Sequence, residues 1–339
     1  MTDRINIVPS SLGRLTAEEC LALIQERRAR RGQLYMSDHL RRRLRGRLER
    51  QLSAAGGPQA PGDLPKPRLE ALRGLAREGA RLAGPGTLEA VDQFAADLHA
   101  EAPWLAEASS FVMWHLRQSV SDGKCGLRLP PLLLVGPPGC GKSRFALRMA
   151  ELGGVPHQRI DVGSGAAGFR ISGLEKGWSS SAAGVPVTTV LEHRVANPLF
   201  IVDEVDKCGS LSRESGGGTS LTVSLLEMLE PLTAARFHCP SYRLPFDMSH
   251  VTWVLTANVL EKVPAPLVDR CRVFHVPEPT VDDLLQVFDR LVADITDPEL
   301  VTDARRCLAQ ALAPAGMSLR QLQAYVRTVR GLQSREELH

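Results

Sequence analysis

The feature that most constrains this chain is a glycine-rich loop set between an apolar run and a helical pattern. Residues 132–143 read LLLVGPPGCGKS, which fulfils the pattern G-x-x-x-x-G-K-[ST]. Glycines allow such a loop to wrap phosphate groups with backbone N–H donors, and the N-terminus of the following helix adds its dipole. The pattern therefore predicts a nucleotide site. Its residues are Gly136, Pro137, Pro138, Gly139, Cys140, Gly141, Lys142 and Ser143.

A second cluster supplies the carboxylates that such a site needs. Residues 198–204 (PLFIVDE) form an apolar run that ends in two acidic side chains. We expect Asp203 to hold the Mg²⁺ shell together with the Ser143 hydroxyl, and Glu204 to polarise the attacking water. Lys142 would meet the β- and γ-phosphate oxygens. The two clusters together predict a nucleotide and Mg²⁺ as ligands and hydrolysis of the nucleotide as the activity.

The pattern of apolar and polar residues divides the chain into three parts. Between residues 126 and 277, short apolar runs alternate with helical patterns, which is typical of a parallel α/β sheet. After Pro277 the pattern is purely helical. Five runs are strand candidates: 132–135, 159–162, 199–202, 251–256 and 273–276. The predicted parts are a helical N-terminal region over 1–125, an α/β core over 126–277 and a helical lid over 278–339.

The N-terminal part carries a local excess of arginine. Residues 27–50 contain ten arginines against Asp38 and Glu49, a local net charge of +8 in a chain whose net charge is +3. Two interpretations fit this segment. It binds nucleic acid or an acidic partner through phosphate or carboxylate groups, or it is an amphipathic helix with a solvated arginine face. In the second case its stripe of leucines docks on a neighbouring element: Leu40, Leu44, Leu48 and Leu52.

Several protein classes are excluded by composition. The chain has no apolar run of about 18 residues, so no membrane span is expected, and its first residues lack the apolar stretch of a secretory signal. Its seven cysteines are scattered without a C-x-x-C pair, which argues against a zinc site and a disulfide framework. We therefore expect a cytoplasmic protein.

The motifs in their order resemble those of the AAA+ ATPases, and within them the ATPase module of the Lon proteases. The resembling stretches are 136–143, 199–207 (LFIVDEVDK), 225–231 (LLEMLEP), 242–258 (YRLPFDMSHVTWVLTAN), 263–270 (VPAPLVDR) and 316–322 (GMSLRQL). The resemblance implies an AAA+ P-loop core with a five-stranded parallel sheet, followed by a helical lid. It also implies a homo-oligomeric ring, usually a hexamer.

The same resemblance gives roles to three further residues. Asn258 matches the polar residue that positions water against the γ-phosphate. Arg270 matches the arginine finger, which reaches the nucleotide of the neighbouring subunit, with Arg272 as a rival for that role. Arg320 matches the arginine through which the lid senses the bound phosphate. These assignments come from the family pattern and not from spacing alone.

The resemblance is weaker in the segment that would line the central pore of a ring. It does not extend to a protease domain. Trp178, in residues 176–184, occupies the place of an aromatic loop that grips a polypeptide in related unfoldases; a packed loop tryptophan is the alternative. Lon proteases place a Ser–Lys dyad after the lid, whereas the last lysine here is Lys262. We therefore expect an ATPase without its own protease.

Two classes of function fit these features. The first is protein remodelling or translocation by a ring, with a protein client selected by the N-terminal helices. The second is a nucleic-acid-associated or assembly ATPase that uses residues 27–50. A pure switch, in which ATP assembles a ring and hydrolysis disperses it, is a weaker third interpretation.

Overall fold

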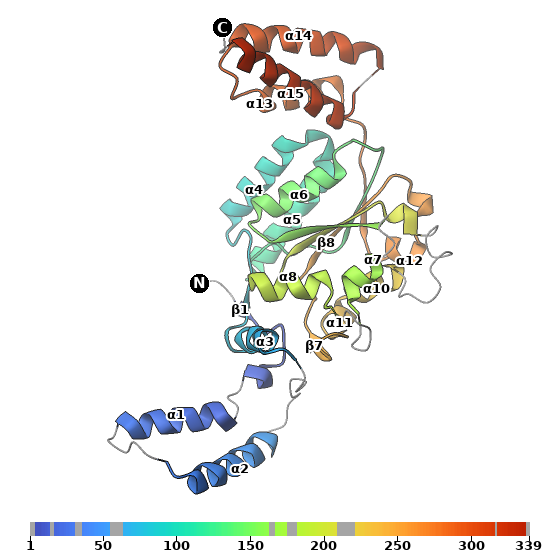
Figure 1. The fold of residues 1–339 in the computed structure, drawn as a ribbon. Coiled ribbons are helices and arrows are strands. Elements are labelled where there is room, and N and C mark those ends of the chain that lie inside the picture. Colours follow the sequence, from blue (N-terminus) through green and yellow to red (C-terminus); the bar gives the residue numbers. More distant parts are fainter. Residues whose placement is uncertain are drawn as a thin grey trace.

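The architecture is a parallel sheet between two layers of helices, seen in a computed structural model (Figure 1). The structure describes residues 4–13, 17–30, 36–54, 64–162, 167–174, 182–208, 221–315 and 317–336. The sheet has five strands in the order β4-β5-β8-β3-β9, and every neighbouring pair is parallel. Its strands are β3 (Leu132–Val135), β4 (His157–Asp161), β5 (Leu199–Asp203), β8 (Thr252–Ala257) and β9 (Arg272–His275). The predicted α/β class and five-stranded parallel sheet are confirmed.

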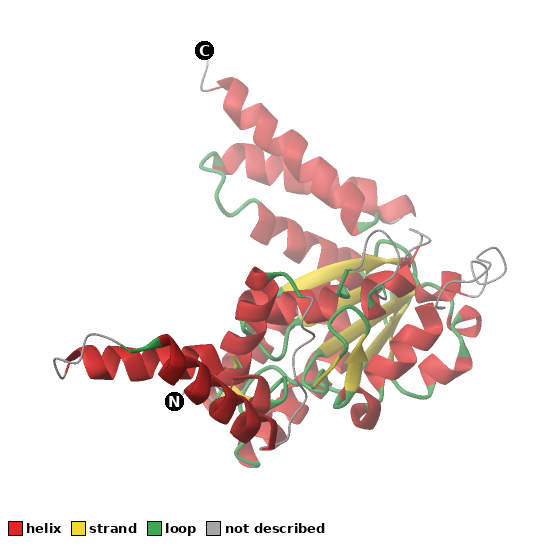
Figure 2. Ribbon diagram, turned by 60° about the horizontal axis from the view of Figure 1, so that its bottom comes forward, coloured by secondary structure: helices red, strands yellow, loops and turns green. Residues whose placement is uncertain are grey.

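The central strands read as continuous apolar runs because helices cover both faces of the sheet. Successive side chains of a strand point to opposite faces. Accordingly, Leu133 and Phe200 pack in one hydrophobic cluster, while Leu132 and Leu199 pack in another. The first face is covered by α7 (Ala167–Ser172), α8 (Val185–His193) and α10 (Leu221–Leu229). The second is covered by α4 (Leu88–Glu101), α5 (Ala106–Ser121) and α6 (Lys142–Leu152). Figure 2 shows the sheet between these layers.

Helices α4 and α5 lie in the predicted N-terminal part of the chain, yet they share a hydrophobic core with the sheet. Val91 and Phe94 of α4 and Val112 of α5 belong to the same buried cluster as Leu132 and Leu134 of β3. The boundary predicted at residue 125 stays a prediction. This shared core argues against a boundary at residue 125.

Shorter elements complete the body. A two-stranded antiparallel pairing joins β1 (Arg4–Ile5) to β2 (Ala80–Arg81), so the N-terminal part is helical apart from these residues. A second antiparallel pair joins β6 (Phe237–Cys239) to β7 (Leu244–Phe246). The remaining short helical segments are η1 (Ser10–Gly13), η2 (Pro103–Leu105), η4 (Val205–Lys207), α11 (Pro231–Ala234), η5 (Leu260–Lys262) and α12 (Ala265–Val268).

The C-terminal lid is a three-helix unit with its own core. It contains α13 (Val281–Leu291), α14 (Pro298–Ala315) and α15 (Leu319–Glu336), packed around a separate hydrophobic cluster. Thr280 and Asp283 form a reciprocal capping box that fixes where α13 begins. The Arg290 guanidinium donates to the backbone carbonyls of Ala100 and Glu101 at the end of α4, so the lid is docked on the body.

The N-terminal helices form a hairpin that projects from the body, at the blue end of Figure 1. It consists of α1 (Ala17–Arg30) and α2 (Asp38–Ala54) and is followed by α3 (Lys66–Glu78). Arg73 and Arg77 of α3 lie 3.5 and 3.3 Å from the Glu19 carboxylate of α1. The leucines at 40, 44 and 48 are only partly buried. Among the described residues, no helix is long and apolar enough to cross a membrane.

Candidate nucleotide-binding site

The glycine-rich loop follows β3 and leads into α6, as the sequence predicts. The Gly136 N–H donates to the Ala257 carbonyl of the neighbouring strand at 3.1 Å. A Cβ at Gly136 would stand 2.2 Å from the Val276 carbonyl oxygen, so any side chain there would displace the loop. Gly139 and Gly141 have φ angles of +85° and +99°, which favour glycine strongly. The backbone thus requires these glycines.

Lys142 begins α6 and turns its side chain back into the loop. The residue is 7% exposed. Its Nζ donates to the carbonyls of Gly136 at 2.7 Å and Pro137 at 2.9 Å. A third acceptor, Oδ1 of Asn258, lies 3.1 Å away. The ammonium group is therefore held where a phosphate chain would lie along the loop, and Asn258 is brought directly to it.

The predicted magnesium ligands contact each other. The Ser143 hydroxyl donates to Oδ1 of Asp203 at 2.6 Å, and the Thr256 hydroxyl donates to the same oxygen at 2.8 Å. The Arg159 guanidinium forms an ion pair with the other carboxylate oxygen. A hydroxyl and a buried carboxylate are the hard oxygen donors that Mg²⁺ prefers, so these residues fit the ion. Held by these residues, the ion would supply positive charge to neutralise the phosphate groups.

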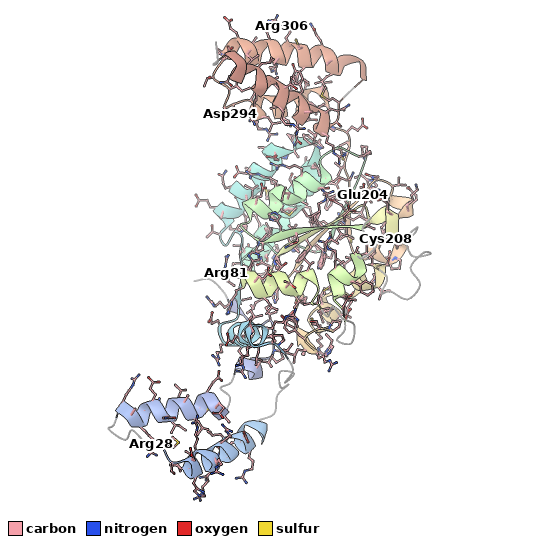
Figure 3. All side chains as sticks on the ribbon, viewed as in Figure 1. Arg28, Arg81, Glu204, Cys208, Asp294 and Arg306 are labelled. Carbon is pink, nitrogen blue, oxygen red and sulfur yellow. The ribbon has the colours of Figure 1, made fainter. Side chains whose placement is uncertain are left out.

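Glu204 stands at the carboxyl end of β5 with an unusual backbone (Figure 3). Its φ of +64° lies in the left-handed region, which costs a non-glycine residue about 1–3 kcal/mol. Its N–H donates to the Thr256 hydroxyl at 3.2 Å, and its carboxylate accepts from Nζ of Lys207 at 2.6 Å. The hydrogen bond and charge of Glu204 raise the pKa of Lys207. The left-handed turn at Glu204 therefore comes directly after Asp203, the last residue of β5.

The two arginines that competed for the finger role lie in different surroundings. Arg270, just after α12, is exposed; its Nε lies 3.7 Å from Glu230, and it donates to the Pro266 carbonyl. Arg272 lies over the rings of Phe111 and Phe274, at 5.7 and 5.9 Å from their centroids. Both arginines are exposed, and they differ only in their contacts within the chain: Arg272 lies over two aromatic rings, whereas Arg270 contacts a carboxylate and a backbone carbonyl.

A cavity of about 540 Å³ opens between the loop and the lid. Gly139, Lys142 and Ser143 line one side, and Arg320 near the start of α15 lines the other. The Leu319 N–H donates to the Gly139 carbonyl at 3.3 Å, so the start of α15 rests on the loop itself. The volume is within the range of small-molecule and cofactor sites, roughly 300–1,000 Å³.

The apolar wall of this cavity includes Trp104 of η2, a residue that belongs to none of the sequence motifs. The Trp104 indole N–H donates to the Cys140 carbonyl at 2.8 Å, and the ring lies beside Gly141. The lid residues Val287 and Leu291 belong to the same lining. Thr256 and Arg159 were missed as well. Their one sequence signal is a position within predicted strands. The structure shows that both strands are neighbours of the strand that ends in Asp203.

Cys140 is enclosed by these contacts. The residue is 2% exposed. Burial raises the pKa of its thiol, although the nearby Lys142 charge acts in the opposite direction. Trp178, by contrast, lies outside the described residues, as does the whole glycine-rich stretch 209–220. In the parts of the chain that are described, no cluster of three or more potential metal ligands of the His, Cys, Asp and Glu type occurs.

Comparisons with known proteins agree with this geometry. Residues 132–278 match the sequence profile of the ATPase family associated with various cellular activities (AAA). The chain is 35% identical over 161 residues to a Lon protease of Syntrophus aciditrophicus, which covers 48% of this chain and 20% of that protein. It is 34% identical over 148 residues to a Lon protease of Nitrosococcus oceani, covering 44% and 18%.

Two further comparisons involve a peroxisomal relative and a solved structure. The peroxisomal Lon protease homolog 2 of Eremothecium gossypii is 34% identical over 165 residues, covering 47% of this chain and 16% of that protein. A solved Hsp104 chain, from a closed-state complex with ATPγS and FITC casein, aligns with a TM-score of 0.49 and 17% identity. That alignment covers 71% of this chain and 45% of that chain, and the likeness is too remote to bear on function.

The chain spans about a fifth of the length of the Lon proteases that it matches. The matched segment coincides with the part that holds the glycine-rich loop, the acidic strand and Asn258. Over residues 132–278 the chain is therefore similar to the AAA family of ATPases, and over about half of its length it is similar to the Lon proteases.

Proposed function

We propose that this chain hydrolyses ATP with Mg²⁺ at the cavity between the loop and the lid. One observation carries the proposal: Lys142, Asp203 and Asn258 come from three adjacent parallel strands or their loops and converge on one point. Such convergence at the carboxyl edge of an open α/β sheet is where ligands bind. Arg320 lines the same cavity from the lid.

The roles of the residues follow from their positions. Lys142 neutralises phosphate oxygens, while Ser143 and Asp203 hold Mg²⁺. Glu204 polarises the attacking water, and Asn258 orients that water against the terminal phosphate. Arg320 couples phosphate binding to the position of the lid. Each role is a proposal supported by the contacts described above.

A direct test compares ATP turnover in the wild-type chain, in Lys142→Ala and in the wild-type chain with EDTA. We expect turnover in the wild type that is lost by a factor of roughly 10² or more in the variant and abolished by EDTA. Arg144→Ala, which removes a neighbouring cation from the rim of the same cavity, is the matched control and should retain turnover. Equal turnover in all four samples would refute the proposal.

We further propose a homo-oligomeric ring, a hexamer, in which Arg270 completes the site of the neighbouring subunit. Its exposed position supports this role; Arg272 is exposed as well, but its guanidinium lies over the Phe111 ring of its own chain. Mixing Arg270→Ala chains with Glu204→Gln chains should restore partial turnover, because some interfaces then combine an intact Glu204 with an intact Arg270. A mixture no more active than its two components would exclude action between subunits.

The work done by such a ring is proposed to be remodelling or translocation of a protein, as the similarity to Lon proteases suggests. Trp178 is proposed to grip the polypeptide. Trp178→Ala should abolish processing of an unfolded model protein such as casein while basal ATP turnover stays within about twofold. Unchanged processing by this variant would remove Trp178 from the mechanism.

A second candidate, binding of nucleic acid or an acidic partner, is favoured by the surface of α2. Arg42, Arg43 and Arg47 are exposed there, whereas Arg41 and Arg45 already pair with Glu18. Neutralising Arg42, Arg43 and Arg47 should weaken binding to single- or double-stranded DNA and lower its salt dependence. Neutralising Arg41 and Arg45 is the control with a smaller expected effect. The absence of any DNA or RNA binding would reject this candidate.

A further inference from the structure

A second, smaller cavity lies at the edge of the sheet opposite the nucleotide loop. Its volume is about 200 Å³. It is lined by His115 and Ser119 of α5, by Lys124 and Arg128 from the segment before β3, and by His250 from the segment before β8. Because β3 and β8 are parallel neighbours, their amino ends lie together, away from the loop at their carboxyl ends. The two cavities are therefore separate.

The lining of this small cavity is basic. No carboxylate is among the described residues that line it. The nearby Asp247 carboxylate is already engaged: its Oδ1 accepts from the N–H and the hydroxyl of Ser249, at 3.0 and 2.6 Å. Its Oδ2 lies 3.6 Å from Nε2 of His250. One carboxylate cannot neutralise both Lys124 and Arg128, so the cavity retains positive potential.

One group of this cavity has a buried atom without a hydrogen-bond partner, and two others are half-buried. Arg128 is half-buried, and burial lowers its pKa while the Asp247 charge acts in the opposite direction. Burial and the Arg128 charge both lower the pKa of His115. The Nδ1 atom of His250 is buried and has no hydrogen-bond partner in the described part of the chain. Buried polar groups without partners cost free energy, which a bound anion would recover.

Size and donor geometry narrow the class of anion. At about 200 Å³, the cavity is below the range of roughly 300–1,000 Å³ that drug-sized ligands need. A nucleotide is therefore too large, whereas a tetrahedral oxyanion with a few waters fits. The planar fork of an arginine matches two oxygens of such an anion, and a lysine adds a point charge at the rim.

We propose that His115, Lys124, Arg128 and His250 form a binding site for a free tetrahedral oxyanion, inorganic phosphate or sulfate. Arg128 is the main ligand from the floor of the cavity. Lys124, which is exposed, adds a positive charge on the solvent side of the site. Since phosphate is a product of ATP hydrolysis, the site would let the chain sense that product away from the nucleotide loop. This last consequence rests on the proposed function, but the binding itself does not.

The test measures phosphate binding by the full chain carrying Lys142→Ala, which removes the lysine of the nucleotide loop. Isothermal titration with inorganic phosphate, at ionic strength fixed with sodium chloride, should give saturable binding with one site per chain. Sulfate should compete. Absence of saturable binding in this background would overturn the proposal, whatever the outcome of the ATP turnover experiments.

Variants then locate the site. Arg128→Gln should weaken phosphate binding by roughly tenfold or more, and Lys124→Gln by about threefold, because each removes a charge-assisted donor. Arg117→Gln is the matched control, since Arg117 lies on α5 but pairs with Asp92 outside the cavity. It should bind phosphate as the parent does. Equal affinity in all three variants would overturn the proposal, and if Arg128→Gln fails to fold, the exposed Lys124→Gln decides.

Discussion

The Thr256 hydroxyl bridges the two acidic residues of the nucleotide site. It donates to Oδ1 of Asp203 at 2.8 Å and accepts the backbone N–H of Glu204 at 3.2 Å. Thr256 lies on β8, the strand beside β5. One hydroxyl therefore orients the proposed magnesium ligand and also anchors the strained backbone of the proposed catalytic carboxylate.

Thr256→Val should leave the shape of the strand unchanged but remove this bridge. Partners that orient metal ligands typically affect metal affinity by about 10- to 100-fold. We therefore expect the Mg²⁺ concentration for half-maximal ATP turnover to rise by roughly tenfold. The control is Thr252→Val on the same strand, whose hydroxyl bonds the Leu127 carbonyl at the opposite end. An equal shift in both variants would show a general loss of stability instead.

Thr256 and Asp203 show which features of the site can be predicted from the sequence and which cannot. The apolar run of residues 199–202 and the two carboxylates after it predict a strand and its site, because both signals are local in the sequence. The contact of Thr256 with Asp203 depends on which strands are neighbours. No pattern within either strand contains that information.

The same distinction holds for the lid and the loop. Capping at Thr280 and Ser318 is a local signal, and helices begin at the residues that follow both. The hydrogen bond from Trp104 to the Cys140 carbonyl joins residues 36 positions apart. Its sequence signal is only an apolar position on a helical face, so its place in the nucleotide cavity could not be predicted.

Gly136→Ala should destabilise the loop. The added Cβ would meet the Val276 carbonyl at 2.2 Å, and backbone cannot yield as a flexible side chain can. Overpacking of this kind costs about 1–3 kcal/mol, so we expect a lower melting temperature together with weaker ATP binding. Gly331→Ala in α15 meets no atom within 4 Å and should be neutral or stabilising. Thermal unfolding with and without ATP distinguishes the two, and a Gly136→Ala chain as stable as the wild type would contradict the account.

Trp104→Phe should weaken ATP binding while preserving the fold. Phenylalanine keeps an aromatic ring on the cavity wall but loses the 2.8 Å hydrogen bond to the Cys140 carbonyl. The loss of one such bond at a buried acceptor costs about 1–3 kcal/mol, which predicts a rise in Kd of roughly fivefold or more. Titration with a fluorescent ATP analogue measures it. Trp114→Phe, at a residue 65% exposed on α5, should leave Kd unchanged.

Cys140 should resist alkylation near neutral pH. Burial raises the pKa of its thiol, and a raised pKa keeps the thiol protonated at pH 7–8. Because the thiolate is the nucleophile, its reaction with iodoacetamide should be slow. Cys307, which is exposed, is the internal reference. Mass spectrometry of labelled peptides should show Cys307 modified well before Cys140, and the rate at Cys140 should increase as the pH rises. Faster labelling of Cys140 would contradict the buried loop.

The most direct test of the central claim separates ATP binding from ATP hydrolysis at Glu204. In Glu204→Gln, Lys142 and the Ser143–Asp203 pair remain in place, so Kd for ATP should stay within about threefold of the wild type. Single-turnover hydrolysis should fall by roughly 10²-fold or more, the scale of losing a general base. Hydrolysis at the wild-type rate in Glu204→Gln would contradict the assignment of this residue as the catalytic carboxylate.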